Sequence, residues 1–161
     1  VSEGTVYEPF GSKEDLLLTI PAKHFERYMS ALPHVFEIKD PLRKLRRFIR
    51  YYFSLFSTER EFLKVFLLQL QLSKRFLGTK EFDSFMRYFR TMERIIEDGK
   101  SDGCFREDVN PRVFRNMFIG TFNNLALRWF ILGGDRHFDK MQKIDQVIEL
   151  LCSAVTVNGG N

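Results

Sequence analysis

Five basic side chains lie within the stretch RKLRRFIR, and no acidic residue interrupts them. They are Arg43, Lys44, Arg46, Arg47 and Arg50. On a helix the four arginines fall on one face, because residues three and four apart are neighbours there. Guanidinium groups bind phosphate oxygens in a fixed, two-pronged geometry, so this face could hold an anionic head group. A solvated basic surface accounts for the same pattern, and both interpretations stay open.

Catalytic and metal-binding motifs are absent from the sequence. The histidines His24, His34 and His137 lie far apart, and neither an HExxH nor a CxxC spacing occurs. No GxSxG motif is present, and Gly133-Gly134 lacks the Lys and Ser or Thr of a phosphate-binding loop. No base that would activate Cys104 can be identified, so an inert thiol is expected. The sequence therefore predicts a protein that is not an enzyme and holds no metal or cofactor.

The composition is that of one globular domain. The 161 residues are 44% hydrophobic and 29% charged, with a net charge of +4. A chain of this length buries roughly 70% of its unfolded surface. No run of about 18 apolar residues predicts a membrane-spanning helix. Two cysteines fit a reducing cytosol, so a cytoplasmic protein is expected, and its modest positive charge permits contact with phosphate without proving it.

Phenylalanine is unusually frequent in the chain. The sequence has 18 phenylalanines, as many as leucines, although leucine is normally among the commonest residues. A core so rich in aromatic rings is bulky and flat-sided. It either frames a cavity for an apolar ligand or packs densely, and dense packing is the more frequent outcome.

Helical periodicity runs along the whole chain, and no segment alternates for long enough to suggest a strand. Asp40-Pro41 supplies an N-cap and a proline at the first helical position for a helix to about Ser57. Apolar residues cover nearly all sides of 59–73, so a central helix is expected there. The other expected helices span 12–20, 22–32 after a break at Pro21, 79–98, 110–132 and 139–155. The sequence therefore predicts an all-α fold.

The first residues carry a dense motif. The stretch VSEGTVYEPFGSKEDLL resembles the recognition helix, turn and connecting-helix start of the tetracycline-repressor (TetR) family of bacterial transcription regulators. The matching residues are Val1, Ser2, Gly4, Thr5, Tyr7, Phe10, Ser12, Lys13, Glu14 and Leu16. By this resemblance, 1–18 is the end of a helix-turn-helix DNA-binding domain, and 19–161 is a ligand-binding and dimerisation domain. A first helix and a positioning helix are expected before Val1.

Two later stretches extend the resemblance. GKSDGCFREDVNP is similar to the loop before the last two long helices of the family, and 63–139 looks most like its fatty-acid-degradation regulators. The resemblance implies a DNA-binding repressor that a hydrophobic small molecule, such as a fatty acyl-coenzyme A, releases from its operator. A multidrug-sensing efflux repressor of the same family is one alternative. A helical lipid-binding or interaction protein with no role on DNA is another.

The resemblance places contacts with double-stranded DNA in the opening residues. The predicted contact residues are Ser2, Glu3, Thr5, Val6, Tyr7 and Lys13. The first two would face base edges in the major groove, Val6 a thymine methyl, and the hydroxyl and ammonium groups phosphates. Without the resemblance, the serines are helix caps and Tyr7 packs against Phe10. Pro9 departs from the family pattern and removes a backbone donor, which puts the affinity for the operator in question.

The expected ligand pocket lies among three apolar helices. Its predicted residues are Phe62, Phe66, Gln69, Leu70, Phe85, Phe89, Met92, Phe118 and Phe122. Gln69 and Gln71 interrupt the apolar stretch LLQLQLS. They either orient a polar head group or pair with neighbouring side chains, and the two interpretations have equal weight.

Family members dimerise through their last two long helices, which are here about 111–132 and 139–155. The first of these has apolar residues on two faces, so one face can serve the core and the other a partner. Gly120 and Thr121 are small enough to let two helices approach closely. The predicted interface residues of a homodimer are Gly120, Thr121, Asn124, Trp129, Ile148 and Leu151. A helix buried entirely within one subunit is the alternative.

Overall fold

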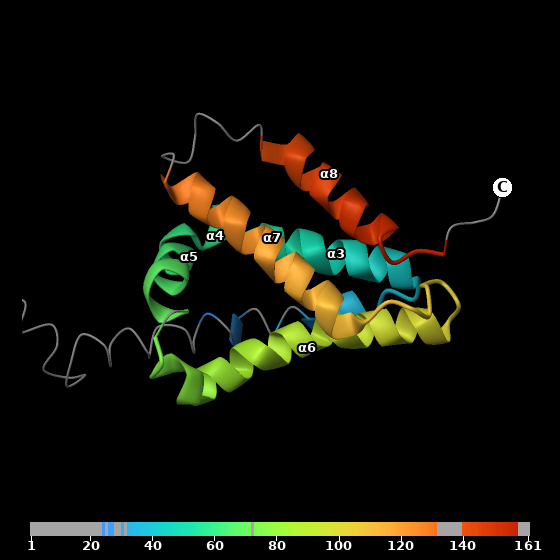
Figure 1. Cartoon of the computed structure of the whole chain (residues 1–161), viewed down its shortest axis with the longest axis horizontal. Coiled ribbons are helices and arrows are strands. Elements are labelled where there is room, and N and C mark those ends of the chain that lie inside the picture. Colours follow the sequence, from blue (N-terminus) through green and yellow to red (C-terminus); the bar gives the residue numbers. More distant parts are fainter. Residues whose placement is uncertain are drawn as a thin grey trace, which may run out of the picture.

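The computed structural model describes residues 24, 26–27, 30, 32–71, 73–131 and 140–157, and this part of the chain is all-α (Figure 1). The helices are α3 (Pro41–Phe53), α4 (Leu55–Thr58), α5 (Arg60–Val65), η2 (Phe66–Leu70), η3 (Phe76–Gly78), α6 (Lys80–Ser101), α7 (Pro111–Ile131) and α8 (Lys140–Ser153). Extended pairing within these residues is limited to one isolated bridge between Phe105 and Thr156. The predicted fold class is confirmed.

Helix α3 lies at the centre of the described bundle. It packs against α6 and against α8, and α7 crosses α6 (Figure 1). The short α5 packs against α7 near the C-terminal end of that helix, where the guanidinium of Arg60 lies 4.7 Å from the centroid of the Trp129 ring. Helix α6 therefore packs against both α3 and α7.

The start of α3 follows from its sequence. The Asp40 carboxylate accepts the N–H of Arg43 at 2.6 Å, and Pro41 occupies the first helical position, as predicted. The predicted end near residue 57 is wrong, since α3 ends at Phe53 and α4 follows as a separate turn. The hydroxyl of Ser54 donates to a carbonyl three residues back, and such local bonds compete with the helical pattern.

The helix predicted over 59–73 is also divided. The N–H of Gln71 donates to the carbonyl of Phe66, five residues back, at 2.9 Å, which is the spacing of a π-helix. The turn η2 therefore holds one residue more than an α-helical turn. It buries Phe66 and Leu70, whereas Leu68 is 45% exposed. The segment is central, as predicted, but one of its faces reaches the surface.

Helix α6 begins after Thr79, whose hydroxyl accepts the N–H of Phe82 at 3.2 Å.

A tight loop joins α6 to α7. After the helix, Gly103 has a φ of +71°, a conformation that glycine adopts without strain. The Phe105 ring then folds back over Gly99, where a Cβ atom would collide with it. The glycines of GKSDGCFREDVNP therefore allow the loop to pack against α6.

Aromatic rings fill the interior. The fully buried phenylalanines of the described residues are Phe48, Phe76, Phe89, Phe105, Phe118 and Phe122. The Tyr52 ring meets three of these edge-on, with centroid distances of 5.4 Å to Phe89, 5.1 Å to Phe118 and 4.3 Å to Phe122. Edge-to-face contacts of this kind are favourable beyond the area that they bury. Dense packing therefore accounts for much of the phenylalanine content.

Candidate functional site

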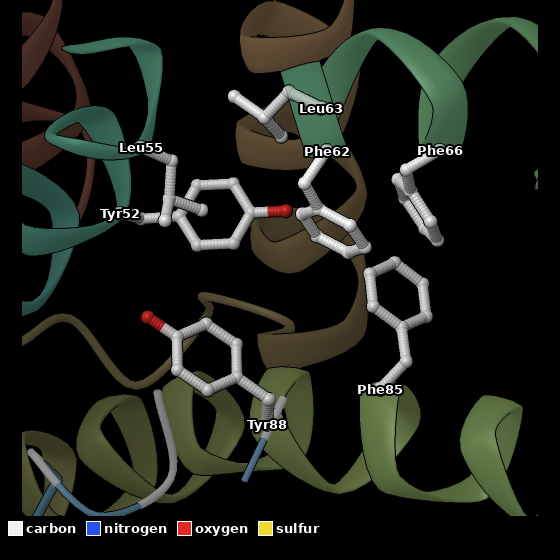
Figure 2. A pocket seen from close by; sticks show the side chains of 7 residues that line it. All are labelled: Tyr52, Leu55, Phe62, Leu63, Phe66, Phe85 and Tyr88. Carbon is white, nitrogen blue, oxygen red and sulfur yellow. The ribbon is translucent and has the colours of Figure 1, made fainter. Parts of the chain in front are cut away.

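An apolar cavity lies where α3, α4, α5, η2 and α6 come together (Figure 2). The side chains that line it are Tyr52, Leu55, Phe62, Leu63, Phe66, Phe85 and Tyr88. In Figure 2 the hydroxyl of Tyr52 points toward the Phe62 ring, while Phe85 and Tyr88 rise from α6 on the opposite side. The lining is almost entirely aromatic and aliphatic, which suits an apolar ligand.

The cavity is small as it stands. Its volume is about 10 Å³, which is the space of about one water molecule. The surrounding rings touch in sequence, with centroid distances of 5.9 Å from Phe62 to Phe66, 4.9 Å from Phe66 to Phe85 and 4.5 Å from Phe85 to Phe89. A long apolar ligand therefore enters only if several rings move, and a movement of one ring displaces the next.

The predicted pocket residues lie at different depths. Phe62, Phe66 and Phe85 line the cavity. Four others are fully buried in the core beyond it: Phe89, Met92, Phe118 and Phe122. Leu70 is buried in η2, whereas Gln69 is exposed to solvent. The assignment of these residues to a ligand stays a prediction, and Gln69 is the member of the set that is exposed to solvent.

The cavity residues that the sequence analysis missed are Tyr52, Leu55, Leu63 and Tyr88. A signal for two of them was present. Tyr52 follows Phe48 by four residues, and Tyr88 follows Phe85 by three, so each continues an apolar helical face. Extending each face by one step, and treating tyrosine as an apolar ring with a polar tip, would have found both residues.

The glutamine alternatives are resolved for one of the two side chains. The Asn123 amide of α7 donates to the side-chain oxygen of Gln71 at 3.2 Å. Gln71 follows the π turn directly, so the extra residue of η2 helps to set the direction of this side chain. Gln71 thus pairs with a neighbouring side chain rather than standing open to a head group.

The basic stretch of α3 is partly neutralised by α8. Arg46 lies 2.8 Å from the carboxylate of Glu149, and Arg50 lies 2.9 Å from that of Asp145. Arg46 and Arg50 are four residues apart on α3, and Asp145 and Glu149 are four residues apart on α8. The two ion pairs therefore lie about one helical turn apart along both helices. Arg43 and Arg47 are exposed. The solvated and the phosphate-binding interpretations both remain open for these two arginines.

Cys152 is buried beside the ion pair between Arg46 and Glu149. Burial raises the pKa of the Cys152 thiol, while the nearby Arg46 guanidinium acts in the opposite direction. The thiol therefore stays protonated at neutral pH and is a poor nucleophile. Cys104, in contrast, is exposed.

The predicted dimer residues fall into two groups. Gly120, Thr121 and Asn124 lie on or near the surface of α7, whereas Trp129, Ile148 and Leu151 are buried within the subunit. Val113 and Met117 are exposed on α7 at 55% and 52%, and Leu150 is exposed on α8 at 71%. Positions 113, 117, 120 and 124 follow helical steps, so they form one surface, here named the exposed α7 face.

The predicted DNA contacts and the domain boundary at residue 18 lie outside the described residues, and they stay predictions. Within the described ranges, no helix is long and apolar enough to cross a membrane. The same ranges hold no group of three His, Cys, Asp or Glu side chains suited to a metal ion.

The described helices share their fold with solved structures of transcription regulators, including a TetR-family regulator. More specifically, residues 22–154 match the family described as the YsiA-like protein, C-terminal region, and the chain belongs to this family of regulators.

Individual relatives agree with this assignment. The chain is 26% identical over 156 residues to the fatty acid metabolism regulator protein of Bacillus subtilis (strain 168), a match that covers 96% of this chain and 79% of that protein. It is 25% identical to the transcriptional regulator FadR from Bacillus subtilis in complex with stearoyl-CoA, with a TM-score of 0.78 over 95% of this chain and 82% of that one. The fatty acid degradation regulator FadR from Bacillus halodurans gives a TM-score of 0.78 at 24% identity, over 94% and 78%.

The comparisons confirm the resemblance to the TetR family. They support a ligand-responsive transcription regulator, and they fit the expectation that the chain is not an enzyme.

Proposed function

We propose that the chain senses a long-chain fatty acyl-coenzyme A and, within a dimeric repressor, leaves its DNA operator when that ligand binds. The aromatic cavity between α3, α5 and α6 is the observation that carries the proposal. Identity of 25% with a regulator crystallised with stearoyl-CoA supports the choice of ligand. In this mechanism the ligand binds more tightly to the conformation that fits DNA poorly, and so shifts the population toward it.

The two parts of the ligand would bind to different parts of α3. The acyl chain would displace the rings around Tyr52 and lie among them. The phosphates of the head group would bind the exposed guanidinium groups of Arg43 and Arg47, which lie nine and five residues before Tyr52, respectively. At about 1.5 Å per residue this is roughly 8 to 14 Å along the helix axis, a distance that a long acyl chain spans.

The DNA would be held by the opening residues. The predicted base contacts come from Ser2 and Glu3, and the predicted phosphate contacts include Lys13. Since phosphate contacts release bound counterions, the affinity of the full-length protein for its operator should fall steeply as the salt concentration rises.

Calorimetry on the full-length protein tests the proposal with stearoyl-CoA, stearate and a hydrophobic cation as ligands. Stearoyl-CoA should bind and should release operator DNA. Replacing Arg43 and Arg47 together by Gln should weaken the binding of stearoyl-CoA by about tenfold or more, because a charge-assisted hydrogen bond contributes about 1.5–3 kcal/mol. The binding of stearate, which lacks the phosphates, should change little. Tightest binding of the cation would favour the multidrug alternative instead.

A further inference from the structure

A buried carboxylate joins the cavity region to the segment before α3. Glu59, between α4 and α5, is only 9% exposed. Its Oε1 accepts Nη1 of Arg27 at 2.9 Å, and its Oε2 lies 2.9 Å from Nδ1 of His24. The histidine nitrogen is close enough for an ion pair, although it is not aligned for a hydrogen bond. One carboxylate thus holds two side chains of the N-terminal segment against the start of α5.

The ring of His24 also touches the wall of the cavity. It stacks on Phe62, with centroids 4.4 Å apart and an angle of 9° between the planes. Phe62 lines the cavity and stacks in turn on Phe66 (Figure 2). A row of rings therefore runs from Phe85 of α6, through the cavity wall, to a side chain of the N-terminal segment.

Phe62 also borders the surface. Besides the cavity, it lines an open groove of about 530 Å³ that also includes His24 and Glu59. Because the His24 ring lies between Phe62 and this open space, a Phe62 ring pressed from within the cavity pushes against His24. Closely packed interiors switch between discrete arrangements rather than deform smoothly, so such a movement has to break or shift the stack.

We propose that His24 is a positioning residue that couples occupation of the cavity to the DNA-binding end of the protein. A ligand that displaces Phe62 disturbs its stack with His24 and shifts His24 and Arg27 relative to α5. These two residues follow the predicted recognition helix along the chain. The inference rests on the proposed function, and it names the contact through which the ligand acts.

Operator binding by the full-length protein, with and without saturating stearoyl-CoA, tests the inference. Fluorescence anisotropy gives the ratio of the two operator Kd values, which measures the coupling between the sites. For the unmodified protein this ratio should lie between about 5 and 150, the usual range for coupled sites. The His24→Ala variant should lower the ratio toward one, although each ligand alone should bind within about threefold of the unmodified protein.

Two further variants test whether the ratio depends on the stacking of residue 24 on Phe62 or changes with any histidine substitution. His24→Phe keeps a ring that can stack on Phe62, and it should retain most of the ratio. His34→Ala is a matched control, because His34 also lies beside a glutamate, with Nδ1 3.6 Å from Oε2 of Glu37, but both side chains are exposed. This control should leave the ratio unchanged. If His24→Ala does not fold, as judged by circular dichroism, His24→Leu takes its place in the test. The leucine side chain fills the space but has no flat ring to stack on Phe62.

The outcomes are distinguishable. An unchanged ratio in a folded His24→Ala or His24→Leu variant overturns the inference, and so does an equal loss in His24→Phe. Failure of stearoyl-CoA to bind the unmodified protein, or to weaken its operator binding, contradicts the proposed function and the inference with it.

Discussion

The Phe105 ring lies directly over Gly99, in the last turns of α6. Replacing Gly99 with Ala would push a methyl group into this ring and force the loop away from α6. The free energy of unfolding should fall by about 1–3 kcal/mol, the usual cost of overpacking. Urea denaturation measures the change.

Gly78→Ala is the matched control, because a Cβ atom there meets nothing within 4 Å. Its effect should stay within about 0.5 kcal/mol, as for most surface substitutions. Equal unfolding midpoints for the two variants would show that the Phe105 ring moves aside with no loss of stability, which would contradict the prediction.

The two cysteines should differ sharply in reactivity. Burial raises the pKa of Cys152, which lowers its thiolate fraction at any given pH, and the thiolate is the form that iodoacetamide attacks. Native protein at neutral pH should therefore gain one adduct, at the exposed Cys104, whereas unfolded protein gains two. Mass spectrometry counts the adducts, and equal labelling of both thiols in the native state would contradict this placement.

The hydrophobic periodicity of the sequence identified the apolar faces of α7, but it did not show what each face packs against. Trp129 looked as suitable for a dimer contact as Gly120, yet the structure buries Trp129 under Arg60 and leaves Gly120 exposed. Which face points inward depends on how α5 and α6 pack against α7, and these contacts join residues far apart in the sequence. The sequence alone specifies two faces and leaves the choice between them open.

Among the elements, helix starts were predictable because they depend on a few adjacent residues. Asn110 accepts the N–H groups of Arg112 and Val113 at 3.0 and 3.2 Å, which explains the start of α7 at Pro111. The break at Ser54 and the π turn of η2 were not predicted. The first accompanies a side-chain bond from the Ser54 hydroxyl, and the second is a backbone hydrogen bond shifted by one residue. Hydrophobic patterning records neither.

The charge pairs between α3 and α8 make a prediction about the packing of these two helices. Arg50→Glu would place two carboxylates together at Asp145 and should destabilise the protein by about 1 kcal/mol at low salt, the upper range for a surface pair. Adding Asp145→Arg should restore most of the loss. Urea denaturation at low salt and in 1 M salt checks this, because a Debye length of about 3 Å at 1 M screens the repulsion.

Arg47→Glu serves as the control, since it reverses the same charge on an exposed side chain of α3. It should cost clearly less than Arg50→Glu. If the double variant is no more stable than Arg50→Glu alone, the ion pair does not help to hold α8 in place.

At the scale of the whole molecule, the described subunit leaves apolar groups in water. The exposed α7 face presents Val113 and Met117 on the same side as Gly120, where a Cβ atom would meet nothing within 4 Å. Leu150 of α8 is exposed as well. A two-fold axis beside α7 would bury this surface against its own copy, as most homodimers do. Dimerisation would also set the spacing of two recognition helices, which must match successive major grooves about 34 Å apart.

The full-length protein should therefore be a dimer at micromolar concentration, and its interface should lie on the exposed α7 face. Met117→Glu would bury a charge at the contact and should yield monomers, whereas Leu77→Glu, at a site that is 54% exposed on η3, should leave the dimer intact. Light scattering coupled to gel filtration measures the mass of each variant. Operator affinity should fall together with dimerisation in the Met117 variant, since a monomer contacts only one half-site. A monomeric unmodified protein, or a dimer that Met117→Glu leaves unchanged, would contradict this interface.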